Sequence, residues 1–337
     1  MTARVITIDP ELPDRGVLAE AAAVLRAGGL VAFPTETVYG LGANALDAAA
    51  VQRIFTAKGR PSFNPLIAHV ADVEGARALV TVWPPVAEKL ARHFWPGPLT
   101  IALPKREHVP NEVTAGRSTV AVRVPAHKVA RALIAEAGIP LAAPSANRYT
   151  QLSPVTAAQV MRSLGDRVDL ILDGGRAGVG IESTVVDLST TPPMLLRPGT
   201  ITRAALERIT GPLASPGVPE RADEPRAAPG MIARHYAPRA RVHLVESDML
   251  ADAVDTVDAS DHSSVAAITW SARGFAAGSS LRRHYHLPGD ASGYAAELYA
   301  SLHAADDAGC AEVLVEQPPP DSDWDGVRDR LMRAAHH

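Results

Sequence analysis

The stretch VDLILD-GGRAGVGIE-STVVDL-STTPP-MLLRPG, residues 168–199, decides the class of fold. Its first, third and fifth parts are short runs rich in Val, Leu and Ile, which is typical of strands. The parts between them are rich in Gly, Pro, Ser and Thr, as expected of loops. Three successive strands break the strict strand–helix alternation of a purely parallel sheet. We therefore expect an α/β domain with a twisted, mixed sheet and helices.

Helices are predicted elsewhere in the chain, where an Ala- and Leu-rich segment follows a capping residue and ends at a glycine. Asp14 and Asp47 are the candidate N-caps, and Gly59 is a stop signal. The predicted helices cover residues 15–28, 47–59, 127–138, 156–165, 202–210, 289–308 and 324–335. Further strands are predicted at residues 30–33, 66–70, 99–103, 119–124, 241–246, 264–270 and 311–316.

The chain length of 337 residues predicts two domains. Residues 211–239 contain six prolines and few apolar residues, so we interpret them as a semi-extended linker. This linker separates a catalytic domain, residues 1–210, from a smaller Rossmann-like α/β domain, residues 240–337.

Bulk properties exclude several classes of protein. The net charge of −4 argues against a general basic coat for nucleic acid. The single cysteine, Cys310, excludes a disulfide framework or a cysteine-based zinc site within one chain. The N-terminus lacks a signal-peptide core, and no apolar run approaches the length of a membrane helix. We therefore expect a cytoplasmic protein with no membrane contact.

Common catalytic motifs are absent from the sequence. There is no GxxxxGK[ST] phosphate loop, GxSxG elbow, SxxK or HExxH. Gly40, Gly42 and Ala45 match GxGxxA, but the acidic ribose partner expected about 20 residues later is missing, and we interpret the glycines as permitting a tight turn. His284 and His286 share one side of a short strand without an accompanying carboxylate pattern, so no metal site is predicted.

Four polar segments carry the remaining chemistry. Each could be only a loop, but together they offer cations, hydroxyls and flexible backbone amides, which can hold phosphates and a carboxylate without a nucleophile. Lys58 stands out because 29 of the 33 Lys and Arg residues are arginine, which indicates a need for a compact ammonium. The segments are PTETVYGLG (34–42), KGRPSFNPLIAH (58–69), APSAN with SP (143–147, 153–154), and DGGRAGVGIESTVVD with LLRPG (173–187, 195–199).

These segments, in this order, resemble the YrdC-like threonylcarbamoyl-AMP synthases. The hallmark of that family is a KxR pair followed by SxN, which matches Lys58-Arg60 and Ser145-Asn147. The sequence APGMIARHYAP, residues 228–238, resembles the tail motif of the long, two-domain, Sua-type form. The resemblance implies synthesis of L-threonylcarbamoyl-AMP from L-threonine, bicarbonate or CO2 and ATP, with release of pyrophosphate, for N6-threonylcarbamoyladenosine formation in tRNA.

The resemblance also implies roles for individual residues. Lys58, Arg60, Ser145 and Asn147 form the catalytic hallmark, near the carbamate and the phosphates. The residues implied to bind ATP are Arg60, Asn64, Thr119, Ser145, Ser153, Arg197 and Tyr236. Those implied to bind L-threonine are Thr37, His69, Arg123, the backbone at Ala143, and Ser183. Mg²⁺ would arrive with ATP, ligated mainly by phosphate oxygens and water. Residues 228–238 are expected to fold over the first domain and close the nucleotide site.

The sequence departs from the family pattern at two places. The residue two before the linker histidine is often aromatic and is here Ala233, and a glycine usual near Thr150 is absent. A competing hypothesis is an RNA-binding YrdC-like module without catalytic turnover, which the negative charge and scarce aromatics weaken. A carbamoyl-transfer domain of the hydrogenase-maturation type is excluded, because those chains carry cysteine-rich zinc modules. The expected partners beyond the substrates are the downstream tRNA threonylcarbamoyl transferase complex and a weak RNA contact.

Overall fold

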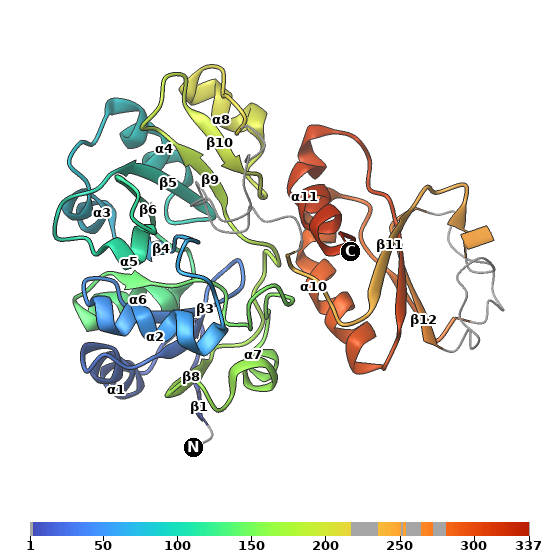
Figure 1. The fold of residues 1–337 in the computed structure, drawn as a ribbon, viewed down its shortest axis with the longest axis horizontal. Helices are drawn as coiled ribbons and strands as arrows, with labels where there is room; N and C mark the ends of the chain where they lie inside the picture. Colours follow the sequence, from blue (N-terminus) through green and yellow to red (C-terminus); the bar gives the residue numbers. More distant parts are fainter. Residues whose placement is uncertain (1–2, 217–234, 251, 254–263, 272–280, 337) are drawn as a thin grey trace.

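The computed structural model describes residues 3–216, 235–250, 252–253, 264–271 and 281–336. Within these residues the chain forms two bodies in contact, each built on one sheet (Figure 1). The larger body, from the N-terminus to α8, carries a ten-stranded sheet in the order β1-β8-β2-β3-β7-β4-β6-β5-β9-β10. The smaller body carries a four-stranded sheet in the order β11-β14-β12-β13.

The ten-stranded sheet is mixed, as the sequence predicts. Parallel pairs join β1 to β8, β2 to β8, β4 to β6 and β5 to β9, and the remaining neighbours are antiparallel. The strands are β1 (Arg4–Thr7), β2 (Val31–Pro34), β3 (Tyr39–Asn44), β4 (Ile67–His69), β5 (Leu99–Pro104), β6 (Thr119–Arg123), β7 (Leu141–Ala142), β8 (Leu170–Asp173), β9 (Thr184–Asp187) and β10 (Met194–Arg197).

Helices cover this sheet and end where capping residues require. Asp14 and Asp47 accept hydrogen bonds from the first backbone amides of α1 and α2, as predicted. Gly59 ends α2 at φ 62°, a left-handed conformation that costs glycine little. The helices are α1 (Arg15–Arg26), α2 (Ala48–Lys58), α3 (Val73–Leu79), α4 (Pro85–Phe94), α5 (Asn111–Thr114), α6 (Lys128–Ala137), α7 (Ala157–Leu164) and α8 (Arg203–Thr210).

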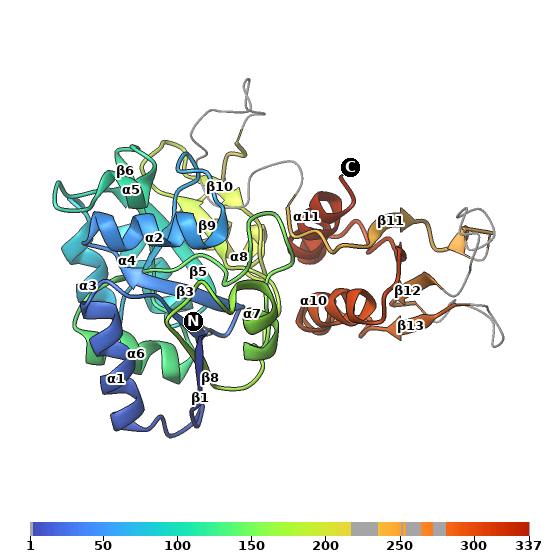
Figure 2. The same ribbon diagram turned by 60° about the horizontal axis from the view of Figure 1, so that its bottom comes forward.

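The C-terminal body is an α/β unit with an all-parallel sheet in its described part, consistent with the Rossmann-like expectation. Its elements are β11 (Arg241–Val245), β12 (Val265–Thr269), β13 (Arg283–His286), α10 (Ala291–Asp307), β14 (Glu312–Glu316), the 3-10 turn η2 (Ser322–Trp324) and α11 (Asp325–Ala334). Helices α10 and α11 lie on the face of this sheet that points toward the larger body (Figures 1 and 2).

The two bodies share apolar packing. Val38, Leu152 and Ile181 from the larger body belong to one buried cluster with Tyr299 and Leu302 of α10. Two glycines bring main chains together: a Cβ on Gly180 would lie 2.2 Å from the carbonyl oxygen of Ala295. A Cβ on Gly326 would lie 2.5 Å from that of Gly199. The bodies therefore form a close-packed contact rather than resting side by side.

Several predictions about local structure were wrong or incomplete. The segment 34–42 was expected to be a loop, but Tyr39 begins the six-residue strand β3. Gly40 and Gly42 lie inside that strand and not at a tight turn, and a Cβ on Gly42 would meet the Phe33 ring at 2.7 Å. Strand β1 and helices α3, α4 and α5 were not predicted at all.

None of the helices in the described part of the chain has the length and apolarity that a bilayer crossing requires.

Candidate active site

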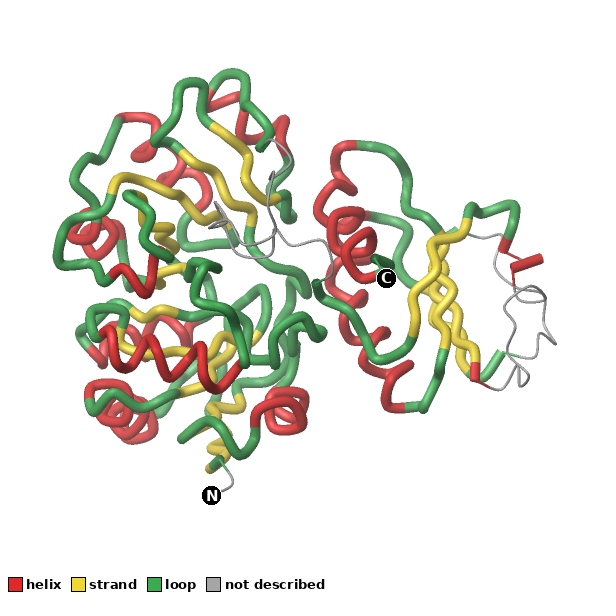
Figure 3. The backbone as a smooth tube through the Cα atoms, in the orientation of Figure 1, coloured by secondary structure: helices red, strands yellow, loops and turns green. Residues whose placement is uncertain are grey.

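A cavity lies where the carboxyl ends of β4, β6, β7 and β10 meet the amino ends of β3 and β9. Figure 3 shows that loops (green) gather on the side of the larger body that faces the smaller one. The cavity holds about 530 Å³ including its mouth. Antiparallel neighbours explain the convergence, because they bring opposite strand ends to one edge. The lining consists of Thr35, Thr37, Val38, Gly40, Arg60, Ile67, His69, Arg123, Ala143, Pro144, Ser145, Glu182, Ser183, Arg197, His235 and Tyr236.

Lys58 holds the APSAN loop in place from behind the cavity wall. It is the last residue of α2, and its side chain is buried. Its Nζ donates to the carbonyl oxygens of Ser145 at 2.6 Å and Asn147 at 2.5 Å. Burial, followed by repulsion from Arg60, lowers the Lys58 pKa well below its ordinary value, although Glu182 acts in the opposite direction. A compact ammonium suits this two-carbonyl grip.

Arg60 enters the cavity from the loop after α2. Its guanidinium donates to the carbonyl oxygens of Asn64, at 3.3 Å, and Pro65, at 2.9 Å. It also lies 5.8 Å from the centre of the Tyr149 ring. Burial lowers its pKa to about 10, so the guanidinium stays charged at neutral pH. Because its partners are neutral carbonyls, this charge remains available to an anion.

Arg123 ends β6 and faces the loop that precedes β3. Its NH2 group donates to the Thr37 hydroxyl at 3.0 Å and forms an ion pair of 2.7 Å with Glu36. Its Nε donates to the Gly97 carbonyl at 3.3 Å. The guanidinium is thus oriented by three fixed groups, and its side chain is only 4% exposed. Such a fork can pair with a carboxylate.

His69 lies beside Arg123 on the adjacent strand, since the two residues are register partners. Burial, with a smaller contribution from the Arg123 charge, lowers the pKa of His69 to about 3. The imidazole is therefore neutral near pH 7, and its Nδ1 lies 3.3 Å from the Ile67 carbonyl. It can exchange hydrogen bonds with a ligand without adding charge.

Arg197 and Ser183 form the opposite wall. Arg197 donates through Nε to the Ser183 carbonyl at 3.0 Å and through NH2 to the Ser183 hydroxyl at 3.1 Å. The Thr100 hydroxyl lies 2.8 Å from the Ser183 hydroxyl. Burial lowers the Arg197 pKa. The wall therefore presents a second buried cation, which donates to two neutral oxygens of Ser183.

His235 and Tyr236 reach the cavity from the segment that leads to β11. Tyr236 is 1% exposed and adopts φ 58°, an unusual conformation for an aromatic residue. The backbone amide of Ala237 donates to the Thr150 carbonyl at 3.0 Å, which ties this segment to the loop after the SxN motif. The buried Nδ1 of His235 has no hydrogen-bond partner among the described residues. The same is true of the side-chain oxygens of Asn64 and Asn147.

Buried polar atoms left without partners are rare in folded proteins and indicate a missing ligand or water. Here three of them, in Asn64, Asn147 and His235, lie in the segments that also carry Arg60, Ser145 and Tyr236. Two family models match this chain: one described as "Telomere recombination" (Sua5, YciO and YrdC) over residues 23–199, and one described as "Threonylcarbamoyl-AMP synthase, C-terminal domain" over residues 201–336. The chain belongs to the Sua5/YciO/YrdC family.

Individual members of the Sua5/YciO/YrdC family are similar in sequence to part of this chain. A threonylcarbamoyl-AMP synthase of Pyrococcus abyssi is 53% identical over 191 residues, covering 57% of this chain and 56% of that protein. One from Bacillus subtilis is 49% identical over 214 residues, covering 63% and 60% of the two chains. The chain thus spans less than two thirds of the length of these curated relatives.

The similarity in structure extends over both bodies. P. abyssi Sua5 in complex with L-threonine superimposes with a TM-score of 0.89 and 38% sequence identity, covering 98% of this chain and 97% of that one. The arrangement of the C-terminal body on the first is therefore shared with a solved member of the Sua5/YciO/YrdC family.

The structure gathers most of the predicted site residues of the Sua5/YciO/YrdC pattern into one lining. Those in the cavity wall are Thr37, Arg60, His69, Arg123, Ala143, Ser145, Ser183, Arg197 and Tyr236. Lys58 and Asn147 lie outside this lining, and the Nζ of Lys58 donates a hydrogen bond to the Asn147 carbonyl. Asn64 and Ser153 are fully buried outside the lining. Thr119 also lies outside it, at the start of β6, four residues or about 13 Å of strand from Arg123.

Three residues that the sequence did not single out occupy important positions. Glu36 pairs with Arg123, Glu182 lines the cavity, and Arg330 of α11 contacts Glu182. Glu36 and Glu182 lie inside two of the polar segments already identified from the sequence, so a search of those segments for carboxylates could have found them. Arg330 lies more than 130 residues from any such segment and carries no local signal.

The two departures from the family pattern have different outcomes. Thr150 adopts φ 68°, the left-handed region that glycine favours, so the loop keeps a glycine-like conformation despite its β-branched side chain. Ala233 lies outside the described residues, as do residues 217–234 as a whole, which make up most of the predicted linker.

Within the described part of the chain, no group of three His, Cys, Asp or Glu side chains could hold a metal ion.

Proposed function

We propose that this protein synthesises L-threonylcarbamoyl-AMP from L-threonine, bicarbonate or CO2 and ATP, and releases pyrophosphate. The observation that carries the proposal is one cavity with a carboxylate-binding fork, Arg123, at one wall and two further buried cations, Arg60 and Arg197, at others. The family names of the relatives and the threonine complex of P. abyssi Sua5 agree with it.

The amino-acid end of the cavity is assigned to L-threonine. Arg123 would pair with the carboxylate, and the Thr37 and Ser183 hydroxyls, neutral His69 and the backbone at Ala143 would bind the amino and hydroxyl groups. A neutral imidazole helps here, because an additional cation would repel the ammonium of the free amino acid. The ammonium of threonine gives up a proton to solvent, the resulting amine forms an N–C bond to CO2, and loss of a second N–H proton to solvent gives the carbamate.

The nucleotide is assigned to the side of the cavity lined by Arg60 and Arg197. Arg60, Arg197 and Ser145 would contact ATP, with Tyr236 covering it and Asn64, Thr119 and Ser153 contributing from outside the lining. The carbamate oxygen attacks the α-phosphorus, the bond to the bridging oxygen breaks, and pyrophosphate leaves. No protein nucleophile is needed, so the residues act by orientation and charge stabilisation.

Lys58 and Asn147 are assigned to positioning the SxN loop, because the Lys58 ammonium grips its two carbonyls. Mg²⁺ would accompany ATP, and the cation-rich lining fits ligation by phosphate oxygens and water instead of by protein carboxylates. We also propose that the chain divides into a catalytic domain, residues 1–210, and a C-terminal domain, residues 240–337, joined by a linker, residues 211–239, that closes the cavity at Tyr236. The product would pass in the cytoplasm to a tRNA threonylcarbamoyl transferase complex.

The test is to incubate the purified full chain with ATP, Mg²⁺, bicarbonate and labelled L-threonine and to separate the products. Threonylcarbamoyl-AMP and pyrophosphate should form in equal amounts, and AMP release should require both threonine and bicarbonate. Arg123→Gln should raise the KM for threonine more than the KM for ATP, because it removes the proposed partner of the threonine carboxylate. ATP hydrolysis to ADP that ignores threonine would contradict the proposal and favour another reaction at this site.

A further inference from the structure

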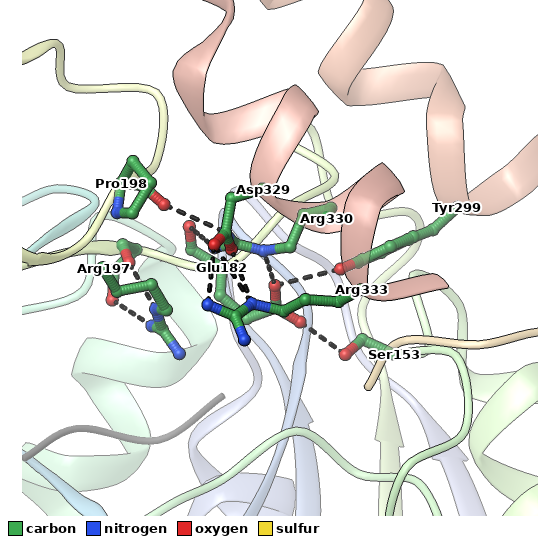
Figure 4. Close-up of polar contacts among 9 residues, drawn as sticks. Ser153, Glu182, Arg197, Pro198, Tyr299, Asp329, Arg330 and Arg333 are labelled. Carbon is green, nitrogen blue, oxygen red and sulfur yellow. Dashed lines mark hydrogen bonds and ion pairs between the residues drawn. The ribbon is translucent and has the colours of Figure 1, made fainter. Parts of the chain in front are cut away.

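A buried ion pair joins the C-terminal body to the wall of the cavity. Arg330, on α11, donates through Nε to a carboxylate oxygen of Glu182 at 2.7 Å, and its side chain is 0% exposed (Figure 4). Glu182 lines the cavity directly beside Ser183. The C-terminal body therefore places a charge one residue away from the proposed substrate contacts.

The other donors of Arg330 fix the main chain of the same wall. Its NH1 donates to the Pro198 carbonyl at 3.0 Å, and its NH2 donates to the Glu182 carbonyl at 3.2 Å. Pro198 follows Arg197, just as Glu182 precedes Ser183. One guanidinium thus holds the backbone beside both proposed ligand-binding side chains. Its NH1 also pairs with Asp329 at 2.7 Å, which keeps the fork oriented.

Glu182 is held from further directions. The Ser153 hydroxyl donates to one carboxylate oxygen at 2.5 Å, and the Tyr299 hydroxyl, from α10, donates to the other at 3.1 Å (Figure 4). The main chains of the two bodies also approach each other closely at Gly180 and at Gly326. The carboxylate consequently has little freedom to turn away from the cavity.

A carboxylate in this position is a problem for a site that binds a triphosphate. An unpaired buried negative charge beside Arg197 would repel the phosphates and cancel part of that cation. Burial acts to raise the pKa of Glu182, but the charges of Arg330 and Arg197 prevail and lower it, so the carboxylate stays ionised. Pairing with Arg330 compensates the charge of Glu182, so this carboxylate cancels less of the positive charge of Arg197.

We propose that Arg330 is a positioning residue of the active site, which neutralises and orients Glu182 and thereby makes the C-terminal body a required part of the nucleotide site. This inference rests on the proposed function, since it takes the ligand beside Arg197 to be ATP. It assigns the C-terminal body a role in every turnover, exerted across the contact between the two bodies.

The experiment compares three full-length variants with the wild type. Arg330→Gln leaves Glu182 unpaired, and the double variant with Glu182→Gln also removes the carboxylate. Arg328→Gln is the matched control, because Arg328 lies on the same helix and pairs with Asp325, away from the cavity. Binding is measured by calorimetry with α,β-methylene-ATP and Mg²⁺, alongside KM and kcat for threonylcarbamoyl-AMP formation and the midpoint of thermal unfolding.

The Kd for the analogue and the KM for ATP should rise at least tenfold in Arg330→Gln, with a smaller fall in kcat. The double variant should recover most of the lost affinity, and Arg328→Gln should match the wild type. A Kd within threefold of wild type in Arg330→Gln, or a double variant that binds as poorly as the single one, would overturn the proposal. If Arg330→Gln does not fold, the double variant carries the test, and failure of both to fold assigns Arg330 to the fold alone.

A pH profile separates this role from a merely structural one. Without Arg330, burial should let Glu182 take up a proton as the pH falls, so the affinity of Arg330→Gln relative to wild type should improve between pH 8 and pH 6. The other groups that act on the carboxylate are the same in both proteins: Arg197, Lys58, Tyr236, Tyr299 and Ser153. Asp329, the second carboxylate paired with Arg330, is also unchanged. A ratio that does not change with pH would refute the neutralising role. A wild type that neither binds the analogue nor forms the product would instead refute the proposed function.

Discussion

Replacing Lys58 by Met tests whether the hallmark lysine acts by gripping the SxN loop. Met keeps the length and apolar stem of the side chain but removes the donors to the Ser145 and Asn147 carbonyls. Each buried carbonyl left without a donor costs about 1–3 kcal/mol. Part of this cost is offset, because burial already disfavours the ammonium, as the lowered Lys58 pKa shows. We therefore expect the free energy of unfolding to fall by about 2–4 kcal/mol.

The same variant should lose kcat/KM by roughly 30- to 1000-fold, since a loop displaced by a fraction of an ångström misplaces Ser145, which we propose contacts ATP. Urea unfolding followed by circular dichroism gives the stability, and pyrophosphate release gives the rate. Lys58→Arg should also lose activity, because a planar guanidinium does not fit between two carbonyls about 2.5 Å from a single nitrogen.

The matched control is Lys89→Met, another of the chain's four lysines, on the exposed face of α4. Its unfolding free energy should stay within about 0.5 kcal/mol of wild type. A Lys58→Met protein as stable and as active as Lys89→Met would refute the reasoning. Normal kcat/KM in Lys58→Arg would show that a positive charge suffices and that a compact ammonium is not required.

Three further predictions follow from single contacts. Glu36→Gln removes the carboxylate paired with Arg123, so the affinity for threonine, measured by calorimetry, should rise; an unchanged Kd would show that this pair does not compete with substrate. The pKa of His69 is about 3 in the folded protein, below its ordinary 6.5, so between these pH values only the unfolded chain binds the proton. The free energy of unfolding therefore falls by about 1.4 kcal/mol for each pH unit as the pH drops through that window. Urea unfolding at pH 7 and pH 5 should show a smaller loss of stability for His69→Gln than for the wild type. Gly180→Ala should destabilise the protein more than Gly175→Ala in thermal unfolding, because both glycines have positive φ but only at Gly180 would a Cβ strike the main chain of α10.

The sequence predicted elements whose signals are local. The helices capped by Asp14 and Asp47 and the strands of residues 168–199 depend on residues within a few positions of each other, and the structure contains them. Strand β3 was missed because its Gly-rich sequence YGLGAN has the composition of a loop. Its conformation is imposed by pairing with β2 and β7 and by the Phe33 ring packed on Gly42. Such tertiary effects override local propensity.

Among the site residues too, those with a local sequence signal were predicted, and those that depend on tertiary contacts were not. The loops that carry Lys58, Arg60 and Ser145 were recognisable because each contains its own motif. The charge state of His69 was not recognisable, since it depends on burial and on Arg123, which lies 54 residues away in sequence on another strand. The role of Arg330 could not be predicted from the sequence for a similar reason. Its partner Glu182 lies in the larger body, and only the packing of the two bodies brings the two side chains together.

The buried cations of the site share one physical device. Lys58 and Arg60 donate to backbone carbonyls, and Arg197 donates to the carbonyl and the hydroxyl of Ser183. Arg123 donates to one carbonyl and one hydroxyl beside the carboxylate of Glu36. A carbonyl satisfies a donor and fixes its direction, but it leaves the net charge in place. A carboxylate at each position would have made the folded protein easier to stabilise and would also have neutralised the cavity. Where a carboxylate does face the cavity, at Glu182, a dedicated arginine from the second body cancels it. The excess positive charge is thereby kept for a ligand that is itself strongly negative, which agrees with the assignment of a triphosphate and an amino-acid carboxylate to this one cavity.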